Sequence, residues 1–235
     1  VLSLRHVLPL RGAWYYTAEI DATDDECPAA GARVRLEMAG REWSGYVVRP
    51  PISDGSRARL RVEAGAGGMR QAVPARAYQS ALLATIAAQA VADAGETLAA
   101  DALASLDVVA QHHRAAGPAG VALTTALSPG SYAWRFNDAG EVWWGLESWP
   151  AASDAGVLEL EPFGDDGSTR VAPLAPTLSP GQVWAGRPVE RVVYELGDDG
   201  LEAELVFSRS SQPSGDLRGL FERAVRAQIR ELPYL

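Results

Sequence analysis

Apolar and polar residues alternate with a period of two through the first third of the chain. The segment 33–38 reads RVRLEM, in which every second residue is apolar. The same alternation predicts strands over 13–20, 42–49 and 57–64, with a hairpin turn at Gly40. Because successive side chains of a strand point to opposite faces, this pattern is typical of an antiparallel sheet or a small barrel with one buried face.

Helical periodicity replaces the alternation in the middle of the chain. Apolar residues recur at helical spacing between Ser80, the expected N-cap, and Gly95, the expected end of this helix. Three further elements are expected here, namely helices over 97–114 and 121–127 and a hairpin with strands over 132–136 and 142–146. This part is therefore predicted to be a small helical region that ends in a hairpin.

The last third of the chain returns to alternation. Strands are expected over 157–161, 183–184, 190–196 and 201–208, and a final amphipathic helix begins at Asp216. We therefore predict a mainly β (α+β) protein with two antiparallel β-barrel-like domains, a small helical insertion and a C-terminal helix. The predicted division is a first β-barrel part over 1–79, a helical insertion with a β-hairpin over 80–150, and a second β region with the C-terminal helix over 151–235.

Charge and length narrow the possible functions. The chain has 235 residues and a net charge of −9, and its 21 basic residues are all arginine. This acidic balance argues against a protein that reads nucleic-acid sequence, which would carry a basic face. No apolar run approaches the roughly 20 residues of a membrane helix, and the chain shows no basic start followed by an apolar segment, so we expect no secretory signal. Cys27 is alone, which fits a reducing compartment.

A glycine cluster follows the strand predicted over 57–64. Gly65, Gly67 and Gly68 resemble a phosphate-binding loop. Such a loop needs either the spacing G-x-G-x-x-G directly before a helix or a lysine after its last glycine. Here Arg70 occupies the place of the third glycine, and the chain has no lysine. We therefore expect the glycines to permit a turn or a close approach between backbone segments.

The usual residues of catalysis and metal binding form no recognisable motif. His112 and His113 are neighbours on an expected helix, where they would point in different directions, and His6 lies in an apolar segment. The sequence shows no zinc motif, no nucleophile elbow and no calcium loop. We therefore expect no catalytic residue, no metal and no cofactor.

Tryptophans gather around the expected hairpin. Trp143, Trp144 and Trp149 lie opposite Trp134. Because Trp143 and Trp144 are adjacent on a strand, one of them should lie outside the local core. Three interpretations stay open for this cluster: a core corner, a protein interface or a platform for a sugar. The apolar stripe of the final helix is either core or a contact with a neighbouring subunit, and its residues are Leu217, Leu220, Phe221, Val225 and Ile229.

Five segments, taken in their order along the chain, together resemble a known family. They are LRGAWYYTAEID near the start, RLRVEAGAGGMRQAVPARAY, the helix SALLATIAAQAVADAGE, the hairpin SYAWRFNDAGEVWWGLESWP and the tail VERVVYELGDDGLEAELVFSR. In this order they resemble the baseplate hub proteins of tailed bacteriophages, including the late-control-protein family and its Mu-like prophage relatives. The resemblance spans most of the chain, and 151–180 carries little of it.

The resemblance implies a ring-forming structural protein built from tube-like β domains, with no catalytic residue to carry over. It implies a homotrimer that adapts the tail tube or a distal tail protein to the central spike or fibre. DNA would pass through the lumen without specific binding, and no membrane partner is expected. The location would be the tail tip or baseplate of the virion, after assembly in the host cytoplasm. Two alternatives stay open: a distal tail or tail-tube component, and a carbohydrate-binding β module that uses the tryptophans.

Overall fold

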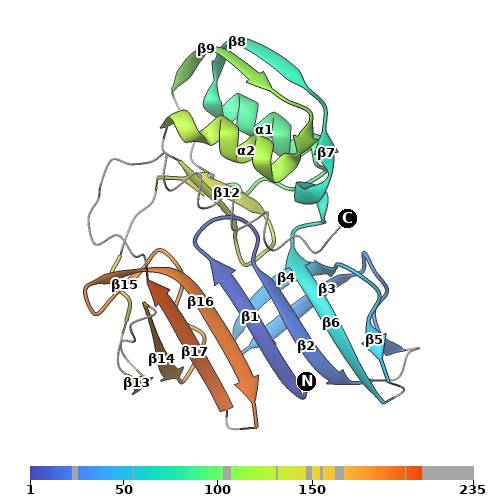
Figure 1. Ribbon diagram of the computed structural model, residues 1–235, viewed down its shortest axis with the longest axis vertical. Coiled ribbons are helices and arrows are strands. Elements are labelled where there is room, and N and C mark those ends of the chain that lie inside the picture. Colours follow the sequence, from blue (N-terminus) through green and yellow to red (C-terminus); the bar gives the residue numbers. More distant parts are fainter. Residues whose placement is uncertain are drawn as a thin grey trace.

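The body of the molecule is one curled antiparallel sheet (Figure 1). The computed structural model describes residues 1–22, 26–54, 56–102, 107–130, 132–146, 150–153, 156–161, 167–198 and 200–207. The strands of the sheet are β1 (Ser3–Pro9), β2 (Tyr15–Asp21), β3 (Arg33–Met38), β4 (Arg41–Val47), β5 (Ile52–Ser53), β6 (Arg57–Ala64), β13 (Val157–Glu161), β14 (Ser168–Pro173), β15 (Val183–Trp184), β16 (Arg187–Gly197) and β17 (Gly200–Phe207).

Strands from both ends of the sequence lie together in this sheet. Its order is β13-β14-β17-β16-β1-β2-β6-β4-β3, with β5 beside β6 and β15 beside β16. β1 pairs with β2 on one side and with β16 on the other, so it joins the first and last thirds of the chain through backbone hydrogen bonds. The prediction of a mainly β fold is confirmed, and strands of both expected β regions share one sheet.

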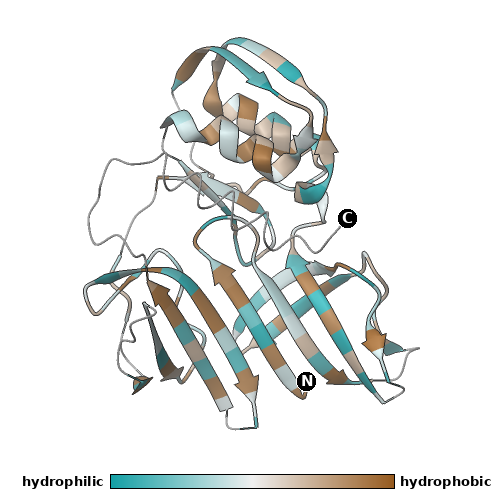
Figure 2. Cartoon of the chain, in the orientation of Figure 1, coloured by the Kyte–Doolittle hydropathy of each residue, from teal (hydrophilic) through white to brown (hydrophobic). Residues whose placement is uncertain are grey.

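The two faces of the sheet differ, as the alternation predicts. On β1, Leu4, His6 and Leu8 are buried on one face, while Arg5 is exposed on the other. Figure 2 shows the same alternation of hydrophobic and hydrophilic residues along the other strands. The buried face holds a core that includes the fully buried Trp43. Each large apolar side chain buried in this way contributes about 2–3 kcal/mol, so the core fixes which face of each strand turns inward.

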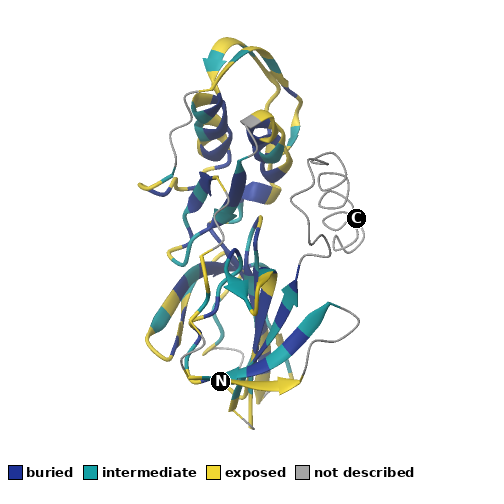
Figure 3. Ribbon diagram, turned by 90° about the vertical axis from the view of Figure 1, so that its left-hand side faces the viewer, coloured by how far each residue is buried: buried dark blue, intermediate teal, exposed yellow. Residues whose placement is uncertain are grey.

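A smaller unit, which we call the cap, lies above the sheet (Figure 1). Its elements are η2 (Gly68–Arg70), β7 (Ala72–Val73), β8 (Arg76–Leu82), α1 (Leu83–Asp93), β9 (Val108–Arg114), β10 (Gly117–Pro118), α2 (Ala119–Leu127), η3 (Ser128–Gly130), β11 (Ala133–Phe136) and β12 (Val142–Gly145). β8 pairs with β9 and β7 with β10, and together they form a two-stranded ribbon that arches over α1 and α2. Figure 3 shows the helices turning buried residues inward while the ribbon stays largely exposed.

A buried arginine holds the ribbon to α1. Arg114 is 3% exposed and faces Arg76 across the ribbon. Both arginines donate to the carboxylate of Asp93, at the end of α1, and Arg114 also donates to the carbonyl of Pro74 at 2.9 Å. The hydrogen bonds from Arg76, and next those from Arg114, lower the pKa of Asp93. One carboxylate therefore compensates two like charges that would otherwise repel each other across the strands.

The expected helix over 97–114 is wrong. Residues 108–114 form β9, which pairs with β8 from Arg76↔Arg114 to Leu82↔Val108. His112 and His113 consequently lie on a strand and point to opposite faces. The leucines at helical spacing suggested a helix, but the adjacent β-branched Val108 and Val109 favour a strand, and the pairing partner lies about 30 residues away, beyond any local pattern.

The expected N-cap at Ser80 is also wrong. α1 begins at Leu83 with Leu82 as its N-cap, and Ser80 lies within β8 with a φ of 47°. Ser80 therefore belongs to the ribbon, although the sequence pattern predicted it at the start of the helix. The end of the helix is confirmed, because Ala94 is the C-cap and Gly95 adopts a φ of 69°. The helix expected over 121–127 is confirmed as α2.

Candidate interaction surfaces

The tryptophans of the hairpin divide between its two faces. β11 and β12 place Trp134 opposite Trp144 and Arg135 opposite Trp143. Trp144 and Trp134 are buried, and the Trp134 indole donates to the hydroxyl of Thr124 at 2.8 Å. Trp143 lies on the other face at intermediate exposure. The expectation that one of the adjacent tryptophans lies outside the local core is therefore confirmed.

Trp143 lines a cavity at the junction of the cap and the sheet. The guanidinium of Arg135 lies 4.7 Å from the centre of the Trp143 ring, which is the distance of a cation–π contact. The cavity has a volume of about 410 Å³. Its wall combines apolar residues with both charges, including Pro9, Arg41 and Asp138. A partner side chain could enter here, and of the two predicted interface residues that the structure describes, Trp143 is the one beside this cavity.

The remaining predicted interface residues have different settings. Trp144 belongs to the core, so the structure gives it no open surface on this chain. Trp149 and the stripe of the expected final helix lie outside the described residues. Leu217, Leu220, Phe221, Val225 and Ile229 therefore stay predictions.

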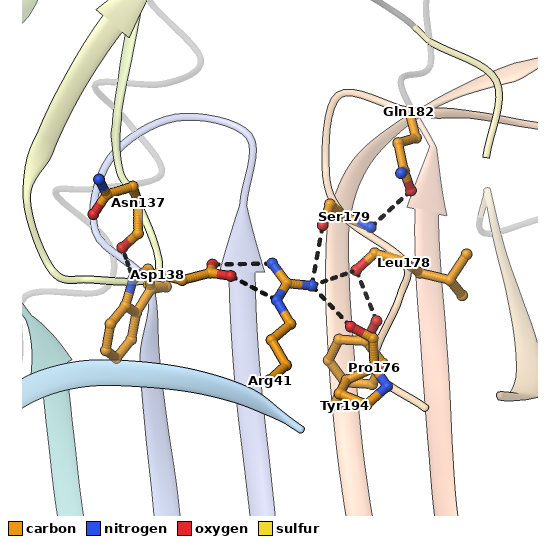
Figure 4. Close-up of polar contacts among 9 residues, drawn as sticks. Arg41, Asn137, Asp138, Pro176, Leu178, Ser179, Gln182 and Tyr194 are labelled. Carbon is orange, nitrogen blue, oxygen red and sulfur yellow. Dashed lines mark hydrogen bonds and ion pairs between the residues drawn. The ribbon is translucent and has the colours of Figure 1, made fainter. Parts of the chain in front are cut away.

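Arg41 joins three segments that are far apart in the sequence (Figure 4). Its guanidinium forms two parallel hydrogen bonds to the carboxylate of Asp138, at 2.7 and 3.0 Å. The third nitrogen donates to the carbonyl of Pro176 at 2.8 Å and to the hydroxyl of Ser179 at 3.2 Å. Only arginine offers such a planar fork of donors. The hairpin turn, the start of β4 and the loop before β15 are thereby held together.

Neighbouring polar contacts extend this junction. The Trp14 indole donates to the carbonyl of Asn137 at 3.0 Å, and the hydroxyl of Tyr194 donates to the carbonyl of Leu178 at 2.7 Å. The amide of Ser179 donates to Gln182 at 2.9 Å. Because both the hairpin turn and the loop are fixed on the sheet, the residues that they contribute to the cavity beside Trp143 are held in place.

The backbone amides of the glycine cluster bind an anion, and this anion is a carboxylate side chain of the same protein. The buried carboxylate of Glu96 accepts hydrogen bonds from the amides of Ala66, at 2.8 Å, and Gly68, at 2.6 Å. A Cβ atom on Gly68 would lie 1.8 Å from the carbonyl oxygen of Ala94. The expected close approach of backbone segments is confirmed, and the sequence reasoning missed Glu96 because it lies 28 residues from the loop.

The histidines and acidic residues offer little metal chemistry. Among the described residues, no group of three or more histidine, cysteine, aspartate or glutamate side chains could hold a metal ion. His6 is fully buried, and His112 is half-buried on the inner face of the ribbon. In the part of the chain that the structure describes, no helix is both long and apolar enough to cross a membrane.

The sheet ends in two edge strands with different charges. β3 exposes Arg33, Arg35 and Glu37 and is positive on balance, while β13 exposes Glu159 and Glu161. All neighbours along the path of nine strands are antiparallel, so the two edge strands run in the same direction. β13 also exposes Leu158 to 65%. Exposed edges of this kind are sites where another strand can add.

The face of the sheet opposite the core carries balanced charges. Arginines and acidic residues face one another across neighbouring strands, as in the pair Arg59↔Glu19. Arg5 donates to Glu195 at 3.1 Å from β1 to β16, and Arg170 of β14 is paired with Glu202 of β17. Opposite charges on facing strands stabilise the sheet by less than about 1 kcal/mol each. The result is a wide polar surface without a block of one sign.

Solved structures of other proteins share this fold, although no protein-family model and no curated protein matches the sequence. The 43 kDa tail protein of prophage MuSo2 from Shewanella oneidensis has a TM-score of 0.66 at 9% identity, over 88% of this chain and 93% of that one. An E. coli component of the type VI secretion system, described as structurally similar to the T4 bacteriophage tail proteins gp27 and gp5, has a TM-score of 0.67 at 12% identity, over 90% of this chain and 74% of that one. A tail protein from Neisseria meningitidis MC58 has a TM-score of 0.62 at 11% identity, over 88% and 92%. At these identities the likeness shows the architecture, and the chain therefore has the fold of phage tail proteins.

Proposed function

We propose that this chain is a structural component of a phage or phage-like tail, and within it a baseplate hub. One observation carries the proposal: two tail proteins and a type VI secretion component described as similar to phage tail proteins share its fold over 88–90% of its length, so this architecture accounts for nearly the whole chain. The proposed role is non-catalytic and needs no cofactor. The proposed place is the tail tip of the virion, after assembly in the host cytoplasm.

The edges of the sheet support assembly into a ring. A ring needs two different surfaces on each copy, so that one surface meets the other on the next copy. β3 supplies Arg33 and β13 supplies Glu159 as exposed charges of opposite sign, while the neighbouring Arg35 and Glu161 form ion pairs within the sheet, with Glu42 and Arg170. Because both edges run in the same direction, a continuous sheet across the joint would be parallel there. We propose three copies per ring.

The balanced polar face of the sheet supports a channel through which DNA passes without being held. DNA-binding proteins hold phosphates with unpaired arginine and lysine side chains. On this face Arg5 and Arg170 are ion-paired, and Arg59 lies opposite Glu19. A wall of this kind gives phosphates few free cations to bind. Above and below the channel, the proposed partners are a tail-tube or distal tail protein and a spike or fibre protein.

The proposed division is an insertion between two β regions, expected at 1–79, 80–150 and 151–235. Because the cap begins at Gly68, the insertion starts before residue 80, and the expected boundary falls inside β8. The tryptophans of the hairpin that the structure describes do not favour the sugar-binding alternative, because Trp144 is buried in the core and Trp143 is only partly exposed. A distal tail or tail-tube component is the closer alternative, since it would share the fold and differ in symmetry.

The mass of the assembled protein tests the proposal. The full chain, purified at several concentrations, would be measured by mass photometry and imaged as negatively stained particles. We expect a species near 75 kDa, the mass of three copies of the 24.9 kDa chain, with three-fold class averages. A six-fold ring would contradict the proposed hub and favour the alternative of a tail-tube component. A monomer at every concentration that also fails to enter tail particles would overturn the proposal.

A further inference from the structure

One strand edge of the cap is unlike the other edges of the molecule. β9 pairs with β8 along one side. Within the described part of the chain, no backbone hydrogen bond reaches its other side. Residues 108–113 read VVAQHH and contain no aspartate, glutamate, lysine or arginine. An open strand edge without charge is a site where another strand can pair.

The other open edges are poorly suited to pairing with a copy of themselves. β3 and β13 expose charged side chains, and two copies of either strand would bring like charges together, whereas β3 and β13 suit each other. β8 contains Ser80 with a φ of 47°, a left-handed conformation that interrupts a regular row of outward amides and carbonyls. β9 has no positive-φ residue and no proline. Of the two edges of the ribbon, β9 is therefore the one with the geometry to receive a strand.

The sequence of β9 is compatible with pairing to itself. Two copies of one strand that pair antiparallel around a two-fold axis place identical residues opposite each other at the centre. A charged residue at that position would meet its own charge, which destabilises the pair. Gln111 lies at the middle of the exposed stretch, on the face of the ribbon away from Arg114 and the helices. Its side-chain amide can both donate and accept, so two copies of it complement each other.

We propose that β9 is a self-pairing edge through which a second copy of this chain adds a strand, extending the ribbon to four strands. Gln111 lies opposite Gln111 of the partner subunit, and Val109 lies opposite the partner subunit's His113. The paired backbone amides and carbonyls supply the contact, and the exposed Val108 and the half-buried Val109 lose water-accessible surface as the strands meet. This contact goes beyond the proposed ring, because a two-fold joint uses the cap, whereas the ring uses the edges of the sheet.

The two contacts do not compete for the same surface. The ribbon lies at the far end of the cap, away from the strands of the sheet (Figure 1). Rings joined through their caps would form a closed pair of rings with two-fold axes between them. Such pairing would cover the uncharged β9 edge in protein that has not yet entered a tail.

Disulfide trapping in the full-length protein tests the two-fold contact. In a background where Cys27 is replaced by serine, Gln111→Cys places two thiols across the axis at a Cα separation of about 4.5–5.5 Å, which suits a disulfide. Gln79→Cys is the matched control, because Gln79 is the cross-strand neighbour of Gln111 on the same exposed face but belongs to the β8 edge. We expect mild oxidation to give about tenfold more covalent dimer with Gln111→Cys than with Gln79→Cys.

Sedimentation of variants that carry a charge on one strand of the ribbon supplies a second readout. Gln111→Glu should abolish the concentration-dependent doubling of mass, whereas Gln79→Glu should leave it intact. Equal cross-linking of the two cysteine variants, or a doubling that survives Gln111→Glu, overturns the proposal. The ring is tested apart from it: Arg33→Glu should prevent ring formation and leave the Gln111→Cys dimer unchanged, so a failure of one contact is distinguishable from a failure of the other.

Discussion

His6 should make the stability of this fold depend on pH in the mildly acidic range. Its ring is fully buried on β1 and is enclosed by aromatic rings, with centroids at 4.7 Å for Trp43, 5.4 Å for Trp14 and 5.9 Å for Tyr16. Within the described part of the chain, neither ring nitrogen has a hydrogen-bond partner. Burial, with a smaller contribution from the positive charge of Arg41, lowers the pKa of His6 to about 3.

The sign of the effect follows from this pKa. In the unfolded chain His6 has its ordinary pKa of 6.5, so the unfolded state binds a proton that the folded state excludes. Stability is therefore lost as the pH falls below 6.5 and continues to fall until about pH 3, at about 1.4 kcal/mol per pH unit. Between pH 7 and pH 5 the expected loss in the free energy of unfolding from this one group is about 2 kcal/mol.

Comparison of the protein with His6→Phe isolates this contribution. Phenylalanine keeps an aromatic ring in the enclosure and removes the titrating nitrogens, so the variant should remain within about 1.5 kcal/mol of the parent at pH 7. Urea unfolding would be followed by circular dichroism at pH 7, 6 and 5. We expect the parent to lose about 2 kcal/mol more than His6→Phe between pH 7 and pH 5.

The control is His113→Gln, because His113 is exposed on the ribbon and lacks the enclosure of His6. This variant should lose as much stability as the parent over the same pH range. Carboxylates that titrate near pH 5 act on all three proteins alike and cancel in the comparison. If the parent and His6→Phe lose equal stability, His6 accepts a proton in the folded state and the reasoning from its burial is refuted.

Three further substitutions probe the internal contacts, each by the free energy of urea unfolding at neutral pH. Glu96→Gln should cost about 2 kcal/mol, because the glycine loop loses a carboxylate that accepts two amide hydrogen bonds, and an unchanged value would contradict this. Arg41→Lys should cost about 1 kcal/mol after allowance for the partial exposure of Asp138, and a value equal to that of the parent would deny the role of the planar fork. Trp144→Ala should cost about 3–5 kcal/mol and Trp143→Ala less than about 1 kcal/mol, and the reverse order would place the core on the wrong face of the hairpin.

The strands that the sequence predicted best are those with one buried and one solvated face. β3 and β6 have the predicted bounds, because in each of them charged residues alternate with apolar ones and mark both the period and the ends. The hairpin of β11 and β12 was found from its turn, where Gly140 adopts a φ of 77° and its amide donates to the carbonyl of Asn137. In these segments the information that decides the structure is local.

The segments that the sequence missed depend on distant partners. β1 carries buried residues at three consecutive positions, from His6 to Leu8, and one of its two neighbours in the sheet, β16, comes from the last third of the chain. Its pattern is therefore not a clean alternation. β9 was taken for a helix because its partner strand precedes α1. No window of a dozen residues contains the pairing of β1 with β16 or that of β9 with β8.

The same limit applies to the polar contacts that fix the candidate surfaces. Arg41 and Asp138 are 97 residues apart, and Glu96 closes a glycine loop that lies 28 residues before it. In the sequence, the glycine loop resembles a phosphate-binding site. In the structure, its backbone amides do bind an anion. The structure supplies the anion from the side chain of Glu96, so the amides that would have held a ligand instead hold the end of α1 against the sheet. A component that acts by its shape needs its parts fixed in this way, because a cap free to tilt would misplace both the cavity beside Trp143 and the β9 edge.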